Sequence, residues 1–194
     1  MGTVRFITGV CAIVVSGCAT APAPSPPTMQ AANVAKATPL ILEESEGERR
    51  TWRELPEHAG PLTTFLLKVD PKNGGSKHLV FLTEELPPGE NIETHRHPGA
   101  DELLFLQSGT ARIHLGDQLR EVHAGATVFI PADTWISVDN IGSDAINLVG
   151  VFSAPGFEEF MRAESVRAGE PYVPLTKAED DEIQRKHAHA VIYR

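Results

Sequence analysis

The chain has little cysteine: only Cys11 and Cys18 occur among its 194 residues. Because both lie near the amino terminus, the rest of the chain has no disulfide and no thiol nucleophile. Basic residues are in the minority, with 17 Lys and Arg against 26 Asp and Glu, and the formal net charge is −9. No basic run or basic-aromatic stripe is present, which argues against a nucleic-acid partner.

Long apolar runs and common catalytic motifs are also missing. No segment approaches the roughly 20 apolar residues that a membrane-spanning helix needs. The absence of a Gly-x-Ser-x-Gly elbow, a phosphate loop and a dinucleotide fingerprint excludes serine-hydrolase and nucleotide-dependent activities. What is present, 41% hydrophobic and 22% charged residues, is typical of a globular protein with one domain and accessory segments.

Residues 1–17 have the features of a secretory signal peptide. Arg5 is the only charge before an apolar run, Ile7–Val15, which is a short hydrophobic region of the secretory type. The following Val15-Ser16-Gly17-Cys18 resembles a bacterial lipobox, which implies that Cys18 is lipidated and anchors the chain to a membrane. Ordinary cleavage at a small-residue site just downstream is the alternative. The residue after the cysteine is Ala19 and not an aspartate. In this respect the chain resembles enterobacterial lipoproteins of the outer membrane, which implies an outer-membrane anchor that faces the periplasm.

The remaining chain divides into three segments by composition. Residues 18–39 are rich in Ala and Pro and predict a semi-rigid tether. Short β-type runs separated by Gly, Pro and Asn predict an antiparallel sandwich or barrel over residues 40–165, and residues 166–194 form a C-terminal extension. The expected strands are 62–69, 78–82, 102–107, 110–115, 119–123, 127–130, 135–138 and 145–152.

Two short helices are expected near the carboxyl end. The first covers 153–162, with Ser153 as a candidate cap and with Phe157, Phe160 and Met161 on one face. The second begins at Thr176, whose spacing to Glu179 is that of a capping box.

The most informative pattern is Gly89-x5-His95-x-His97-x4-Glu102-x6-Gly109. Side chains alternate faces along a strand, so His95 and His97 point the same way. Two imidazoles and a carboxylate from the next strand are a common ligand set for a divalent transition metal. The pattern resembles the first motif of the cupins at all its defining positions. This resemblance implies an all-β, double-stranded β-helix or jelly-roll barrel with a metal site at His95, His97 and Glu102.

A second pattern, Gly125-x5-Pro131-x-Asp133-x2-Ile136-x3-Asn140, resembles the second cupin motif with two departures. Asp133 replaces a glycine, and Ile136 replaces the histidine that supplies a fourth ligand in the family. The expected site therefore has three protein ligands and open positions for water or substrate. Iron, manganese, nickel, copper and zinc all accept such ligands. The alternative is a metal-free cupin whose polar groups hydrogen-bond to one another.

Other residues are candidates for the missing ligand. A bend after Pro131 could turn Asp133 inward, His78 lies on an earlier strand, and a tail folded over the barrel mouth could deliver His187 or His189. Side chains of these types are more often found at the surface.

Alternation also predicts what lines the pocket and how the chain associates. The expected lining is apolar and suits a small, partly apolar ligand. The segment 102–107 is apolar on both faces, with Leu104 and Leu106 on the Glu102 face and Leu103 and Phe105 on the other. A strand of this kind is buried on both sides, which requires cover by N-terminal strands or by a second subunit and predicts a homodimer. The expected lining residues are Phe81, Thr83, Leu106, Ile136 and Val138.

The sequence therefore predicts an envelope-anchored, single-domain cupin that binds one divalent transition metal and acts on a small organic molecule. Metal-dependent oxidation or isomerisation, of the dioxygenase or isomerase type, is the enzymatic interpretation. A non-catalytic cupin that holds a small ligand, with or without metal, is the alternative. The fold alone does not select the reaction, because one fold hosts many activities.

Overall fold

The computed structural model describes residues 37–56 and 63–194. The expected signal peptide, Cys18, most of the 18–39 tether and His58 lie outside the described residues. Within the described part of the chain, no helix has the length and apolar character needed to cross a membrane.

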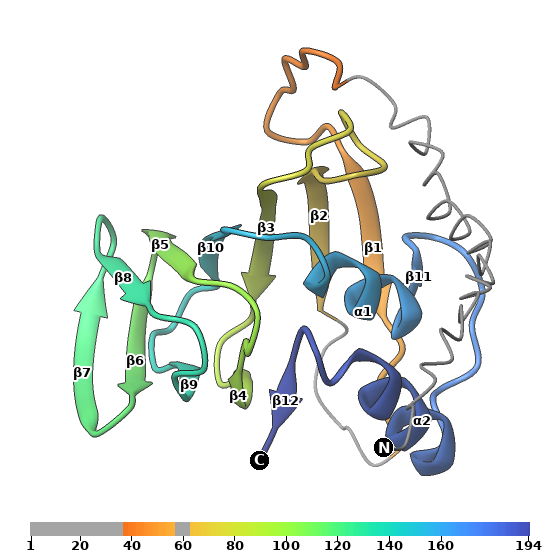
Figure 1. Ribbon diagram of the computed structural model, residues 1–194. Helices are drawn as coiled ribbons and strands as arrows, with labels where there is room; N and C mark the ends of the chain where they lie inside the picture. The colour runs from red at the N-terminus through yellow and green to blue at the C-terminus, as the bar shows by residue number, and fades with distance from the viewer. Residues whose placement is uncertain (1–36, 57–62) are drawn as a thin grey trace, which may run out of the picture. The chain divides into compact units, whose positions relative to one another are not determined.

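Two antiparallel sheets make up a jelly roll (Figure 1). This confirms the all-β fold predicted from the motifs. The larger sheet has the strand order β11 (Ser165–Arg167), β1 (Glu48–Trp52), β2 (Thr64–Val69), β3 (Val80–Leu86), β10 (Ile146–Phe152), β5 (Glu102–Ser108) and β8 (Thr127–Ile130). The smaller sheet has the order β12 (Ile192–Tyr193), β4 (Asn91–Arg96), β9 (Ile136–Asn140), β6 (Thr110–Leu115) and β7 (Gln118–His123).

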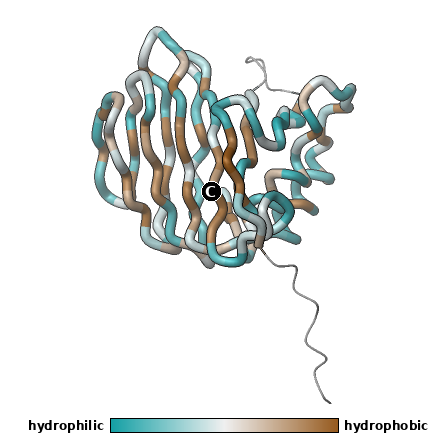
Figure 2. Tube along the Cα trace, turned by 90° about the horizontal axis from the view of Figure 1, so that it is seen from above, coloured by the Kyte–Doolittle hydropathy of each residue, from teal (hydrophilic) through white to brown (hydrophobic). Residues whose placement is uncertain are grey.

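The core between the sheets follows from strand alternation. Inward residues of β5, β10, β6 and β9 form one buried apolar cluster, in which Leu106, Ile136 and Val138 are each at most 3% exposed. Figure 2 shows apolar segments along the strands and polar ones at many of the turns. At an end of the barrel, Gly109 has φ +86°, and a Cβ there would lie 2.4 Å from Cγ2 of Ile146. The turn into β6 therefore requires glycine.

A second buried cluster lies where helix α1 (Phe157–Ala163) packs on the larger sheet. Phe160 and Met161, which are 0% and 1% exposed, meet Phe65 and Leu67 of β2 there. The expected helix face is thus confirmed, but its predicted cap is wrong. Gly156 is the N-cap, and the Ser153 hydroxyl instead accepts a hydrogen bond from the backbone N–H of Asp101.

Helix α2 (Lys177–His187) begins with the expected capping box of Thr176 and Glu179. It contacts α1 and strand β12, and Figure 1 shows both helices at the opposite end of the jelly roll from β7. The chain then returns to the barrel, where Ile192 pairs with Arg96 and Tyr193 pairs with His95. The C-terminal residues therefore reach the strand that carries the first histidine.

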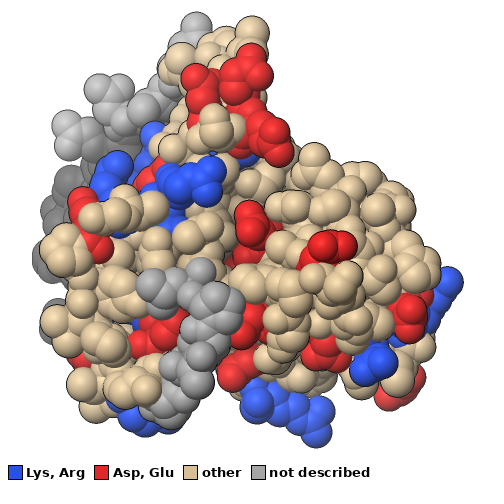
Figure 3. All heavy atoms as spheres, turned by 180° about the vertical axis from the view of Figure 1, so that it is seen from behind, with Lys and Arg blue, Asp and Glu red and all other residues tan. Residues whose placement is uncertain are grey.

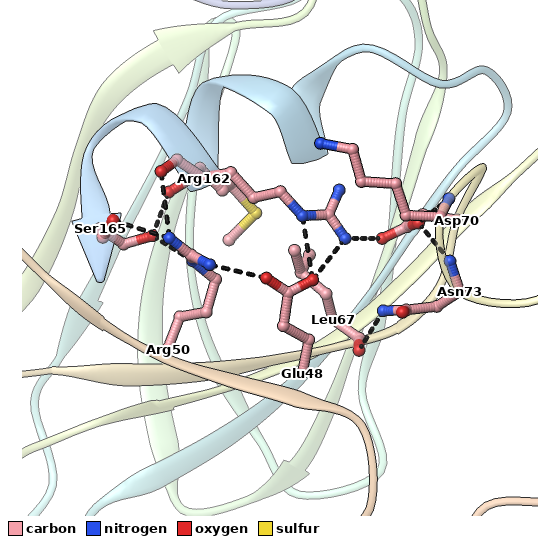
Figure 4. A network of polar contacts seen from close by, with 9 residues as sticks. Glu48, Arg50, Leu67, Asp70, Asn73, Arg162 and Ser165 are labelled. Carbon is pink, nitrogen blue, oxygen red and sulfur yellow. Dashed lines mark hydrogen bonds and ion pairs between the residues drawn. The ribbon is translucent and has the colours of Figure 1, made fainter. Parts of the chain in front are cut away.

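A buried ionic network joins α1 to the larger sheet (Figure 4). Arg162 Nη2 lies 2.6 Å from both a Glu48 oxygen and an Asp70 oxygen. Arg50 donates to the other oxygen of Glu48 at 2.6 Å and to the hydroxyl of Ser165 at 2.7 Å. Burial acts to raise the pKa of Glu48, but the hydrogen bonds from the two arginines outweigh it and lower that pKa. The network fixes the position of the helix on β1.

Most strand predictions are close to the observed bounds. The expected 110–115 and 127–130 match β6 and β8, and the Gly116-Asp117 turn joins β6 to β7. The expected 78–82 starts two residues early and ends four residues early relative to β3, with consequences for the site. Strands β1, β4, β11 and β12 are missing from the predicted ranges, because none of them has a clear apolar alternation. Strand β4 was implied only by the assumption that His95 and His97 alternate along a strand.

The outer face of β5 is not covered by the described residues. Leu103 is 41% exposed, and its cross-strand partner Phe129 on β8 is 59% exposed. The described N-terminal segment lies over β2 instead, where Lys68 donates to the backbone oxygens of Glu43 and Glu44. The described N-terminal strands therefore do not provide the cover that the sequence requires.

Candidate metal centre and adjoining cavity

The three motif residues meet at the end of the barrel. His95 lies on β4, His97 directly after it, and Glu102 is the first residue of β5. One ligand atom from each lies within 4.8 Å of the others, and all three side chains are buried. No fourth His, Cys, Asp or Glu of the described ranges joins them. A metal about 2.1 Å from each donor needs donor separations of roughly 3–3.5 Å, so a small inward movement suffices.

Backbone carbonyls fix which nitrogen of each imidazole faces the centre. His95 Nδ1 donates to the carbonyl of Glu93 at 2.7 Å, and His97 Nδ1 donates to the carbonyl of Ala190 at 2.9 Å. A carbonyl only accepts, so each Nδ1 carries the proton and each Nε2 carries the lone pair. His97 Nε2 then lies 3.5 Å from Glu102 Oε2. Carbonyl partners of this kind orient metal-binding histidines.

Burial sets the charge of the three groups. Desolvation lowers the pKa of His95, and desolvation together with the neighbouring His95 lowers the pKa of His97 to about 3. Desolvation and the nearby Glu84 raise the pKa of Glu102 to about 8. Both histidines are therefore neutral, as metal ligands must be, and metal binding would release a proton from Glu102.

The candidate ligand atoms of His97 and Glu102 do not hydrogen-bond to one another, and a metal ion would satisfy both. His97 Nε2 and Glu102 Oε2 are buried and have no hydrogen-bond partner. An unpartnered buried polar atom costs about 1–3 kcal/mol, which a shared cation would remove. The rings of Phe152 and Phe157 lie 4.9 and 4.6 Å from that of His97, so water is largely excluded from one side.

The second motif has lost its metal ligand, but its other residues still have structural roles. Asp133 has φ +66°, a conformation that favours glycine, and its carboxylate pairs with Arg96 at 2.8 Å. It therefore points away from the centre and is not a substitute ligand. Asn140 is 4% exposed and donates to the carbonyls of Leu86 and Asp144, so it stabilises a turn. Ile136 is 1% exposed and pairs with His95 across the sheet.

The remaining candidate ligands do not reach the centre. His78 and His189 are exposed, and His187 is half-buried against Phe160, with 6.2 Å between ring centroids. The tail does return to the barrel, where it pairs with β4 as the edge strand β12 of the smaller sheet. It contributes the carbonyl of Ala190 and the ring of Tyr193, 5.5 Å from that of His95, in place of a histidine.

The prediction for the pocket lining needs correction. Leu106, Ile136 and Val138 are packed within the apolar cluster and line no open space beside His95. Phe81 and Thr83 lie on the outer face of β3, because the inward residues of that strand are Val80, Leu82, Glu84 and Leu86. A half-buried glutamate, Glu84, on the inner face interrupts the apolar alternation, which led to the wrong assignment of faces.

The structure instead has a cavity between His95 and the helices α1 and α2. It has a volume of about 420 Å³ and reaches from β1, β3 and β4 to α1, α2 and the tail. Its walls combine aromatic side chains with carboxyl groups, so it differs from the expected apolar pocket, although the barrel interior itself is apolar. Sequence reasoning missed Glu84, Glu164 and Tyr193 here; only the motif position of His95 could have directed attention to its neighbours. The aromatic lining residues are Trp52, Phe157 and Tyr193.

Fold and site together define a cupin-type jelly roll with a candidate mononuclear metal centre. Residues 82–152 match the Cupin_2 family model, described as a cupin domain. A crystal structure of a predicted oxalate decarboxylase from Thermotoga maritima is similar, with a TM-score of 0.52 and 19% identity, covering 60% of this chain and 100% of that one. At this identity the likeness shows the fold. These findings support a cupin domain over residues 82–152.

Two curated proteins share part of the sequence. YrkC, an uncharacterized protein of Bacillus subtilis, is 29% identical over 85 residues, which cover 41% of this chain and 46% of that protein. Mannose-1-phosphate guanylyltransferase 2 of Escherichia coli O157:H7 is 35% identical over 66 residues, covering 34% of this chain and 14% of that protein. The chain therefore spans less than half the length of either relative.

Proposed function

We propose that this chain is a metal-binding cupin in which His95, His97 and Glu102 hold one divalent transition metal that acts on a small organic molecule. One observation carries the proposal: two buried donor atoms, His97 Nε2 and Glu102 Oε2, face each other without a hydrogen bond. The carbonyls of Glu93 and Ala190 hold both imidazoles in the ligand form.

The chemistry expected of the site is oxidation or isomerisation. A bound metal with open positions would polarise a carbonyl or enediol, or activate oxygen. The protein's own contribution is to orient both imidazoles, to exclude water with Phe152 and Phe157, and to accept a substrate through the cavity beside His95. Two histidines and one carboxylate suit iron, manganese, nickel, copper or zinc.

A second candidate is a non-catalytic cupin that binds a small ligand. Ile136 favours it, since the side chain opposite His95 offers no donor atom and a three-ligand centre holds metal less tightly. Turnover distinguishes the two candidates, because the non-catalytic form has none even when loaded with metal.

The cellular setting is also a proposal. Lipidation of Cys18 would anchor the domain (residues 40–165, with extension 166–194) to the outer membrane on its periplasmic side through the 18–39 tether. The exposed Leu103 and Phe129 support a homodimer formed through the outer face of β5 and β8. In Cys18→Ser, unprocessed precursor without acyl labelling is expected; normal maturation of that variant would favour ordinary signal cleavage.

Elemental analysis of the protein purified without chelator or histidine tag tests the metal site. We expect near-stoichiometric metal in the wild type and its loss in His95→Ala/His97→Ala. His78→Ala/His114→Ala is a matched control, because both side chains are exposed. If the wild type takes up none of the five metals when each is supplied, the metal proposal is wrong.

A further inference from the structure

The cavity beside His95 carries a large excess of acidic side chains. Among its described lining residues, Arg53 is the one cation. The Arg53 guanidinium is directed elsewhere, with Nε donating to the carbonyl of Val173 at 3.0 Å and Nη2 lying 3.9 Å from Glu179. Figure 3 shows that acidic side chains are also spread over the face seen from behind. The acidic lining residues are Glu54, Glu84, Glu90, Glu93, Glu164 and Asp180.

Two of these carboxyl groups have no cation beside them. Glu84 projects inward from β3 and accepts a hydrogen bond from Trp52 Nε1 at 3.1 Å, but no described Lys or Arg forms an ion pair with it. Glu164 has a buried oxygen, Oε1, without a hydrogen-bond partner. Burial is the main reason that the pKa of Glu84 rises to about 7 and that of Glu164 to about 8. A cation in the cavity would stabilise both carboxylates.

The acidic groups are too dispersed to bind a metal ion of their own. In the described part of the chain, the only set of three ligand atoms close enough to share an ion is that of His95, His97 and Glu102. A larger cation with its charge spread over several atoms would instead span the cavity.

The aromatic walls favour an organic cation. Trp52, Phe157 and Tyr193 line the same space, and aromatic faces attract ammonium groups, by about 2 kcal/mol or more when water is excluded. The volume, about 420 Å³, is within the range for small-molecule sites. His95 is only 6% exposed yet lines this cavity. The cavity therefore adjoins the candidate metal centre at His95.

We propose that the cavity binds a small organic cation, an amine or quaternary ammonium compound, and places it next to the metal centre. Carboxylates of Glu84 and Glu164 face the charge, and the rings of Trp52, Phe157 and Tyr193 surround it. A dianion such as oxalate is disfavoured, because it would enter a space lined by six acidic residues. This inference rests on the proposed function for the reaction of such a ligand, whereas its binding is measured separately from metal binding.

Calorimetric titration of the metal-loaded protein tests the charge preference. The probes are choline, its neutral isostere with a tert-butyl group in place of trimethylammonium, and oxalate. The pH is held near 9, above the pKa values of Glu84 and Glu164, which are about 7 and about 8. We expect choline to bind at least about tenfold more tightly than the isostere, since only the cation gains from the carboxylates and rings.

Matched variants then locate the site. Glu84→Gln and, independently, Glu164→Gln should each weaken choline binding about tenfold and leave binding of the isostere unchanged. Glu85→Gln is the control, since Glu85 is exposed on the outer face of β3, and it should leave choline binding unchanged. Thermal unfolding of each variant verifies that it is folded.

The outcomes separate the two proposals. Equal affinity for choline and the isostere, or tighter binding of oxalate than of either, overturns the organic-cation inference even when metal is present. Choline binding that is weakened by Glu84→Gln in a protein unable to hold metal supports the inference and overturns the metal function instead. Choline binding that survives both glutamate substitutions in folded protein places the cation elsewhere and overturns the inference.

Discussion

The imidazole of His97 donates through Nδ1 to the backbone carbonyl of Ala190, 2.9 Å away. This bond joins the barrel to the C-terminal tail and leaves Nε2 as the free ligand atom of His97. The neighbouring pair of Tyr193 and His95 in the β12–β4 ladder holds the tail in place. The tail is thus a part of the candidate metal centre.

Removal of residues 189–194 should weaken metal binding about 10–100-fold, because it removes the Ala190 carbonyl that orients His97. A loss of this size is usual when a hydrogen-bond partner of a metal-binding histidine is removed. Competition with a fluorescent chelator measures it. Removal of Arg194 alone, which is exposed, should change the affinity less than about twofold. Equal affinities for both truncations would contradict a role for Ala190.

Ile136→His should tighten metal binding at least about tenfold, because the side chain opposite His95 would supply a further ligand. In the absence of metal, the same variant should lose about 1–3 kcal/mol of unfolding free energy through its buried polar ring. If the protein is an enzyme, turnover should fall as an open position is filled. Ile136→Leu is the control, and metal affinity unchanged in Ile136→His would show that position 136 does not face the centre.

Arg162→Ala should cost about 3–5 kcal/mol of unfolding free energy, since it leaves the fully buried Asp70 without its cation and leaves Glu48 with Arg50 alone. Urea denaturation provides the measurement. Arg185→Ala removes a pair with Glu182 in which the arginine is 71% exposed, and should cost at most about 0.5 kcal/mol. Similar losses in both variants would show that the network does not fix α1.

Above about pH 6.5, the ordinary pKa of a histidine, the stability of the metal-free protein should fall as the pH rises to about 8. Below it, His95 and His97, whose pKa values are lowered, act in the opposite direction. Burial, and then Asp180, Glu54 and Glu93, raise the pKa of Glu164 to about 8 from its ordinary value of 4.5. Folded Glu164 therefore holds its proton more tightly than the unfolded chain does. Its contribution to stability is full below pH 4.5 and is lost as the pH rises through about 8.

Glu164→Gln should make this pH dependence shallower and should raise the unfolding free energy near pH 8 by about 1 kcal/mol or more, since one pKa unit is worth about 1.4 kcal/mol. Glu84 and Glu102 shift in the same direction, so part of the slope remains. Glu170→Gln, at an exposed position, is the control. Identical slopes for Glu164→Gln and the wild type would contradict a buried, protonated Glu164.

Light scattering at micromolar concentration should give a dimer mass for the wild type and a monomer mass for Leu103→Glu/Phe129→Glu. The two side chains are 41% and 59% exposed on paired strands, and charges there would oppose burial at an interface. Leu119→Glu, on β7 of the other sheet and 57% exposed before substitution, should remain dimeric. A monomeric wild type would end the dimer hypothesis.

The sequence correctly predicted the features that depend on the alternation of side chains along a strand. His95 and His97 share a face, and a short turn brings Glu102 to them, so three residues close in sequence identified the centre. Glu84 was missed because an inward carboxyl group in β3 looks like the outer face of a strand. Ala190 and Tyr193 were missed because they reach the centre through the two-residue strand β12, which is too short to have a pattern.

The bond between His97 and Ala190 spans 93 positions, which has a consequence for biosynthesis. During translation, His95, His97 and Glu102 emerge together, long before the carbonyl that fixes the His97 tautomer. A nascent chain that ends before residue 190 therefore has its three ligands but not their final orientation. Loading of the proposed metal site would thereby be coupled to the last stage of synthesis, and truncated chains would acquire the ion poorly.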